Sequence, residues 1–139
     1  MKTNTPIRVR YQETDQMGVV YHANYLVWFE LGRTDFIEAL GFHYHEIEKQ
    51  GVLSPVIDAN IHYGKPVRYG EKATVETWLE AYDGLRITYG YRVLKENGEE
   101  SVSGSTKHVI VKEDSFRPVS IRRSFPEWHE AYQSALEEE

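Results

Sequence analysis

One apolar-rich stretch, from Ala23 to Leu40, constrains this chain more than any other feature. It ends at Gly41, and a glycine directly after the last apolar residue is a typical helix stop. Asn24 is a suitable N-cap for its start. The first turns, residues 25–29, read YLVWF and are apolar on nearly all sides, so such a helix must be buried rather than lie on a surface. The sequence therefore predicts a helix of about 25 Å that the rest of the chain encloses.

Strand patterns lie on both sides of this helix. Before it, Ile7, Val9 and Tyr11 alternate with arginines, which is the period-2 pattern of a half-buried strand. After it, a short polar segment precedes several strands separated by tight turns at Asp83-Gly84 and Asn97-Gly98. Strands are expected over residues 53–63, 72–82, 85–95 and 100–112, and a last helix after Pro126 is expected over residues 127–138.

The order of these elements predicts an α+β fold: a strand, one long helix, then an antiparallel meander. Residues 1–139 show no repeat, linker or boundary, so we expect a single domain. The sheet must curl around the helix, and such a sheet has edge strands that can pair with a second subunit. We therefore expect a homo-oligomer, either a dimer or a tetramer.

Composition excludes several classes of protein. The chain has no cysteine, which rules out disulfide scaffolds, cysteine nucleophiles and thiolate metal sites. No apolar run approaches the roughly 18 residues of a membrane span, and residues 1–10 lack the layout of a secretory signal, so the cytoplasm is the expected location. The net charge of −6 argues against a nucleic-acid partner. Five of the 22 acidic residues lie after Pro126, so the rest of the chain is nearly neutral.

The segment from Tyr11 to Tyr25 reads YQETDQMGVVYHANY and resembles the signature of the hotdog-fold acyl-CoA thioesterases. It is most similar to the 4-hydroxybenzoyl-CoA thioesterase branch and to its relatives associated with the bacterial Tol-Pal system. A second segment, YGKPVRYGE at residues 63–71, is similar to a connection in that family. The resemblance implies a hotdog fold, in which an antiparallel sheet wraps around one central helix, and hydrolysis of acyl-CoA to free acid and CoA. It implies no cofactor, because coenzyme A is part of the substrate.

With cysteine and serine nucleophiles excluded, a carboxylate is the group that remains to attack the thioester, either directly or by activating water. Cysteine is absent, and no serine stands in a Gly-x-Ser-x-Gly elbow. Asp15 lies in a loop that leads into the buried helix, and free amides at a helix N-terminus can polarise a carbonyl. From spacing alone, an Asx-turn or a capping role is the commoner interpretation of Asp15. The resemblance implies that Asp15 is the nucleophile or general base and that the backbone amide of His22 polarises the thioester carbonyl.

Residues around these two are candidates for holding the substrate. Gly18 would let the backbone approach the substrate closely. Tyr21 and Tyr25 are candidates for shaping the acyl pocket, although tyrosines at the start of a buried helix are more often core. The His22 imidazole would position water or the thioester as a neutral donor, and a packed histidine at a helix start is the alternative.

Candidates also stand further along the chain. Ser54 matches a position at which the resembling branch has a hydroxyl residue. The resemblance implies that this hydroxyl belongs to the neighbouring subunit and holds the attacking water. Arg68 and Arg86, together with Lys65, are candidates for the CoA phosphates, since phosphate prefers arginine and lysine donors. Each of the three is more often a surface strand residue. The cluster at residues 43–46, HYHE, offers too few ligands at an unsuitable spacing, so no metal site is expected.

Two other functions stay open at this point. A hotdog hydratase or dehydratase would carry an Asp-x-Asn-x-x-His arrangement or a His/Glu pair, and neither is present. A non-catalytic acyl-CoA-binding hotdog protein would be expected to lack the loop carboxylate or to carry a DNA-binding extension. The acyl group is open between aryl and short- or medium-chain aliphatic, because Gln16-Met17 replaces residues seen in some relatives. The choice between CoA and acyl-carrier protein is open as well.

Overall fold

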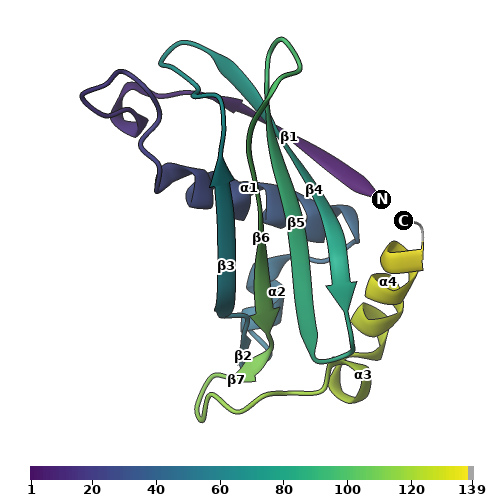
Figure 1. The fold of residues 1–139 in the computed structure, drawn as a ribbon. Coiled ribbons are helices and arrows are strands. Elements are labelled where there is room, and N and C mark those ends of the chain that lie inside the picture. Colours follow the sequence, from purple (N-terminus) through teal and green to yellow (C-terminus); the bar gives the residue numbers. More distant parts are fainter. Residues whose placement is uncertain (138–139) are drawn as a thin grey trace.

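A five-stranded antiparallel sheet and a long helix make up most of the molecule (Figure 1). The structure, a computed structural model, describes residues 1–137. The sheet has the order β1-β4-β5-β6-β3, with strands β1 (Lys2–Arg8), β3 (Val56–Tyr63), β4 (Lys72–Tyr82), β5 (Arg86–Lys95) and β6 (Glu100–Val109). A two-stranded ribbon pairs β2 (Val52–Leu53) with β7 (Val111–Lys112). The helices are η1 (Tyr11–Glu13), a single 3-10 turn, and α1 (Asn24–Ala39), α2 (Tyr44–Glu48), α3 (Ile121–Ser124) and α4 (Pro126–Glu137).

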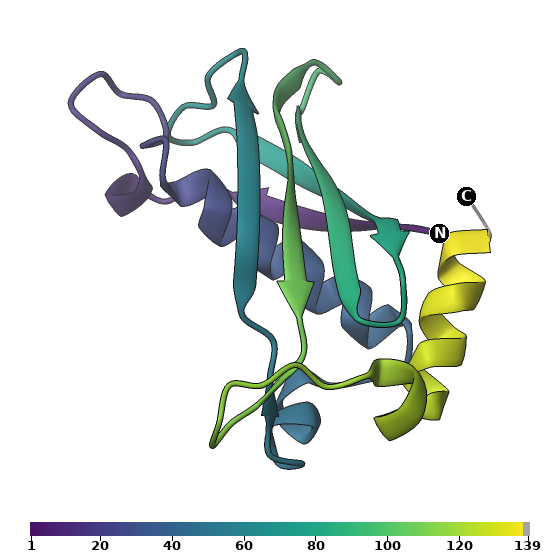
Figure 2. The ribbon, with the colours of Figure 1, turned by 60° about the horizontal axis from the view of Figure 1, so that its bottom comes forward.

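The α+β prediction is confirmed: α1 crosses one face of the curved sheet (Figure 2). Phe29 stacks on Tyr91 with ring centroids 4.3 Å apart, and Phe36 meets Tyr89 edge-on at 5.9 Å. Gly32 lets the helix approach β4, because a Cβ there would overlap the Thr77 hydroxyl. Aromatic side chains from the helix and from β5 therefore form the centre of the core.

The expected meander holds for three strands only. β4, β5 and β6 are consecutive neighbours, and the glycines of their two turns, Gly84 and Gly98, have φ values of 89° and 88°. β3 pairs with β6 at the sheet edge, because β1 occupies the place beside β4. The connection at residues 64–71 therefore crosses the end of the sheet (Figure 1).

Several expected boundaries are corrected. The first strand occupies residues 2–8, and Tyr11 lies in η1. Asn24 does not cap α1; it is the first helical residue, and its Nδ2 donates to the Glu13 carbonyl at 2.8 Å. The strand expected over residues 53–63 is interrupted at Ser54-Pro55, where the chain leaves the ribbon and joins the sheet. Position 138, the expected end of the last helix, lies outside the described residues.

Within one chain, α1 is not enclosed on most sides, so that prediction is wrong. One face of the helix is buried, but Leu26, Val27 and Leu31 are 40%, 46% and 47% exposed. On the edge strand β3, Val56 and Ile57 are also exposed. Among residues 1–137, no helix is long and apolar enough to cross a membrane. The uncovered side chains of α1 and β3 are therefore a surface that another protein surface can cover.

A buried polar network connects β6 to β5 and α1. His108 is fully buried, and its Nε2 lies 2.9 Å from the Thr106 hydroxyl. That hydroxyl lies 2.6 Å from the Tyr91 hydroxyl, which accepts a hydrogen bond from Arg33 Nη1 at 3.3 Å. Burial, reinforced by the nearby charge of Arg33, lowers the pKa of His108 to about 4.

This buried histidine predicts a loss of stability on acidification. The ordinary pKa of the imidazole is 6.5 and the folded value is about 4, so between these values the unfolded chain binds more protons. The contribution of His108 is fully present above pH 6.5 and is lost as the pH falls to 4, by about 3 kcal/mol. Urea unfolding across this range measures the loss. His108→Gln should flatten the slope, and an unchanged slope in that variant would contradict the assignment.

Candidate active site

Asp15 lies in a tight loop between η1 and α1. Its backbone N–H donates to the Val19 carbonyl at 2.9 Å, and its carbonyl accepts from the Gly18 N–H at 3.0 Å. Gly18 has a φ of 77°, in the left-handed region that favours glycine. Carboxylate Oδ1 accepts the Met17 N–H at 2.8 Å, so Asp15 does form an Asx-turn. Among residues 1–137, Oδ2 has no hydrogen-bond partner, so one carboxylate oxygen is available for chemistry.

The cavity beside this loop has a volume of about 190 Å³. Three predicted site residues, Asp15, His22 and Tyr25, line it together with Lys65, a further candidate for the CoA phosphates. The remaining lining comes from the same loop, from the end of β3 with the connection after it, and from the start of β6: Met17, Val19, Val20, Tyr63, Gly64, Pro66, Ser101 and Val102. The structure therefore gathers the motif residues around one space, with Tyr63 and Ser101 as wall residues that the sequence did not single out.

His22 lies two residues before the first residue of α1. Its carbonyl accepts a hydrogen bond from the Tyr63 hydroxyl at 3.1 Å, and its ring lies against Tyr21, with centroids 4.4 Å apart. Its backbone N–H, in contrast, donates to no acceptor within residues 1–137. A free N–H just before a 16-residue helix, near the positive end of the helix dipole, can stabilise negative charge on a carbonyl oxygen. The site thus contains an available carboxylate oxygen and an available amide donor.

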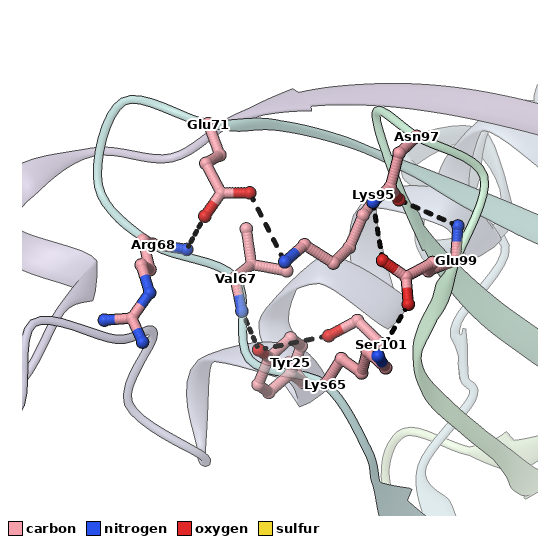
Figure 3. A network of polar contacts seen from close by, with 9 residues as sticks. All are labelled: Tyr25, Lys65, Val67, Arg68, Glu71, Lys95, Asn97, Glu99 and Ser101. Atoms are coloured by element: carbon pink, nitrogen blue, oxygen red, sulfur yellow. Dashed lines mark hydrogen bonds and ion pairs between the residues drawn. The ribbon is translucent and has the colours of Figure 1, made fainter.

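Tyr25 forms part of the wall and also supports the neighbouring connection. It is buried, and its hydroxyl accepts the Val67 N–H and lies near the Ser101 hydroxyl, each at 3.4 Å (Figure 3). Its ring meets Tyr63 at 5.9 Å, so two tyrosines line the cavity together. Both interpretations of Tyr25, core residue and pocket wall, therefore apply to the same side chain.

Ion pairs hold the connection at residues 64–71 onto the β5–β6 hairpin (Figure 3). Lys65 Nζ lies 2.8 Å from Glu99, and Lys95 Nζ lies 3.6 Å from Glu71. The Arg68 N–H donates to Glu71 at 3.0 Å, and its backbone pairs with Val19 of the loop that holds Asp15. The guanidinium of Arg68 points away from this network in Figure 3. Arg68 is therefore the cation near the cavity that is better placed to receive a ligand, since Lys65 is already paired.

Two predicted residues lie at the other end of the molecule. Ser54 precedes β3, whereas the cavity lies beyond the end of that strand, eight residues or about 26 Å away. Arg86 stands opposite Val109 and is paired with Asp83 at 3.5 Å, while the cavity reaches β6 at Val102. Within one chain, neither side chain reaches the cavity.

The HYHE cluster of residues 43–46 lies away from the cavity. His43 Nδ1 is 3.8 Å from Glu38, and both side chains are about half exposed. Within residues 1–137, no group of three or more histidine, aspartate or glutamate side chains is arranged to hold a metal ion.

Comparison with known proteins shows the family of this chain. The family model of the thioesterase-like superfamily matches residues 9–129. The chain belongs to this superfamily. A Bacillus subtilis (strain 168) protein named "Putative acyl-CoA thioesterase YneP" is 55% identical over 129 residues, covering 93% of this chain and 94% of that protein. The acyl-CoA thioester hydrolase YbgC of Escherichia coli O157:H7 is 26% identical over 112 residues, covering 81% and 82% of the two chains.

A solved structure is similar over nearly the whole chain. The DHNA-CoA thioesterase from Staphylococcus aureus superposes with a TM-score of 0.95 at 48% identity, covering 98% of this chain and 91% of that chain. The hotdog fold and a thioester hydrolase acting on acyl-CoA are therefore confirmed at the level of the family. Membership of the narrower 4-hydroxybenzoyl-CoA and Tol-Pal branch stays a prediction.

Proposed function

We propose that this protein hydrolyses an aromatic acyl-CoA, with Asp15 as nucleophile or general base. One observation carries the proposal. Asp15 has a carboxylate oxygen and His22 a backbone N–H that are both without protein partners among residues 1–137, and both residues line one cavity that also has tyrosine walls. The volume, about 190 Å³, is below the roughly 300 Å³ of common ligand pockets. The cavity therefore suits the acyl group alone, with CoA outside it.

The aromatic class is favoured by the wall and by a relative. Tyr25 and Tyr63 present rings to the cavity, and aromatic rings pack well edge-to-face. The Staphylococcus aureus protein, 48% identical to this chain, is named a DHNA-CoA thioesterase. An aryl-CoA of one or two rings is thus the substrate class that we propose.

Two chemical courses use the same geometry. As a base, Asp15 takes a proton from water, hydroxide adds to the thioester carbon, the C–S bond breaks, and the proton passes to the departing thiolate. As a nucleophile, the carboxylate adds to the same carbon, expels CoA thiolate and forms an anhydride that water then cleaves. In both, the carbonyl oxygen becomes negative beside the His22 N–H. A single turnover in heavy-oxygen water that leaves label in Asp15 establishes the nucleophilic course, with water attacking the Asp15 carbonyl carbon of the anhydride, because the base course puts the label only in the product acid.

Arg68 is proposed to bind a CoA phosphate. Its backbone pairs with Val19 of the loop that holds Asp15, and its guanidinium points away from the ion-pair network around it. A guanidinium suits phosphate because it donates two parallel hydrogen bonds.

We further propose that the active form is a homodimer joined along β3. All residues of this edge strand except Ile61 are exposed, and apolar side chains of α1 are uncovered. Antiparallel pairing of two β3 strands about a two-fold axis places the start of one strand beside the end of the other. Ser54 of the partner subunit would then lie near Tyr63 and the cavity. This arrangement explains how Ser54, remote within one chain, can serve the site.

The proposed substrate class is tested with a panel of thioesters and a thiol-release assay. We expect kcat/KM for 4-hydroxybenzoyl-CoA and DHNA-CoA to exceed that for butyryl-CoA and octanoyl-CoA by at least about ten-fold, as one well-filled pocket contact allows. The same acyl groups on acyl-carrier protein test the carrier. Equal or faster hydrolysis of the aliphatic substrates would refute the aromatic class and leave the hydrolase assignment standing.

A further inference from the structure

We propose that Glu13 is a positioning residue, whose buried side chain holds the Asp15 loop and the His22 amide in place on α1. The proposal rests on the function proposed above, because Asp15 and His22 are taken from it. Glu13 lies two residues before Asp15 and is only 6% exposed. No other aspartate or glutamate within residues 1–137 is buried.

The carboxylate of Glu13 joins the segment after β1 to α1. Oε2 accepts the indole N–H of Trp28 at 2.8 Å, and Oε1 accepts the backbone N–H of Arg10 at the same distance. The Arg10 guanidinium adds a contact of 3.4 Å to Oε2. Trp28 is fully buried in α1 and packs edge-on against Tyr25, so its indole is a fixed anchor. The start of the Asp15 loop is thereby attached to a rigid part of the core.

The main chain of Glu13 reaches the other half of the site. Its carbonyl accepts two hydrogen bonds at 2.8 Å, from the Tyr21 N–H and from the Asn24 side chain. Tyr21 precedes His22, and Asn24 is the first residue of α1. One residue therefore connects the segment before Asp15 with the segment that presents the His22 amide, and both are tied to α1.

A carboxylate suits this position better than an amide. The three N–H groups that face Glu13 are all donors, and an ionised carboxylate is an acceptor at both oxygens. A glutamine would turn an NH₂ group toward one of these donors and leave the buried Trp28 N–H or the Arg10 N–H unsatisfied. Burial acts to raise the pKa of Glu13, but the hydrogen bonds from Trp28 and Arg10 outweigh it and lower the pKa. The side chain therefore stays ionised at neutral pH.

The expected consequence of Glu13→Gln is a loss of rate without a matching loss of binding. A misplacement of about 1 Å between reacting groups can lower a rate by about 100-fold, so kcat should fall by about that factor. KM should stay within about three-fold, because the tyrosine wall and Arg68 are untouched.

Thr5→Val is the matched control. Thr5 is buried on β1, and its hydroxyl donates to Asp35 of α1 at 2.6 Å. The variant therefore also removes one hydrogen bond that ties a segment to α1, but in the second half of the helix. Its melting temperature should drop about as much as that of Glu13→Gln, with kcat near the wild-type value. If Thr5→Val lowers kcat as much as Glu13→Gln does, the effect is one of general stability and the proposal is wrong.

Trp28→Phe tests the same contact from the helix and serves if Glu13→Gln does not fold. It removes the indole donor and keeps an aromatic ring, so kcat should fall by about ten-fold. In the double variant, kcat should be no lower than in Glu13→Gln alone, because both changes break one interaction. Independent, multiplicative losses would overturn the proposal, as would a Trp28→Phe enzyme of wild-type kcat.

Failure of this inference is distinct from failure of the proposed function. Wild-type kcat in Glu13→Gln, beside an inactive Asp15→Asn, would overturn the positioning role alone. Wild-type kcat in Asp15→Asn would refute the catalytic assignment of Asp15, and the positioning role with it.

Discussion

Replacing Asp15 by asparagine is expected to lower kcat by about 1,000-fold, within the range that a positioned general base supplies. Asparagine keeps an oxygen that can accept the Met17 N–H, so the turn survives. The neutral amide can neither take a proton from water nor attack the thioester carbon. Turnover is measured by thiol release, and the fold by circular dichroism and melting temperature.

Gln16→Ala is the control for this substitution. Gln16 is the exposed neighbour of Asp15 in the same loop, and no described contact engages its side chain. Its replacement should change kcat by less than about three-fold, the effect of an ordinary surface substitution. An Asp15→Asn enzyme that retains even a tenth of wild-type kcat would exclude Asp15 as nucleophile or base.

The second large effect is expected from Leu31→Glu, on the uncovered side of α1. Leu31 is 47% exposed in one chain, so a single chain tolerates the charge. In the proposed dimer, the change would bury an unpaired carboxylate, which costs several kcal/mol. The variant should therefore sediment as a folded monomer. Its kcat should fall by about 100-fold, because Ser54 of the partner subunit no longer reaches the cavity.

Asn4→Glu adds the same charge on β1, the opposite edge of the sheet, and should leave both assembly and turnover unchanged. Analytical ultracentrifugation across a range of concentrations gives the oligomeric state. A wild-type chain that sediments as a monomer would contradict the dimer. A fully active monomer of Leu31→Glu would contradict the shared site.

Much of the local structure followed from neighbouring residues. The strand at residues 72–82 and the turns at Asp83-Gly84 and Asn97-Gly98 lie where the period-2 pattern and the turn residues placed them. These features depend on contacts within a few positions, so a pattern contains the needed information. The motif YQETDQMGVVYHANY likewise located Asp15, His22 and Tyr25, which the structure places around one cavity.

Other features were decided only by packing between distant segments. β3 lies beside β6 because β1 occupies the place next to β4, a competition that no strand shows in its own pattern. Glu13 meets Trp28 fifteen positions away, and only the folded chain shows that this acid is buried.

The apolar residues of α1 mark the boundary between what the sequence determined and what tertiary structure decided. Their pattern predicted a helix, and a helix formed at residues 24–39, because helical hydrogen bonds are local. The same pattern predicted burial on most sides, yet Leu26, Val27 and Leu31 are exposed. An apolar side chain lowers the free energy when it leaves water. Only the three-dimensional arrangement determines whether its own chain covers it.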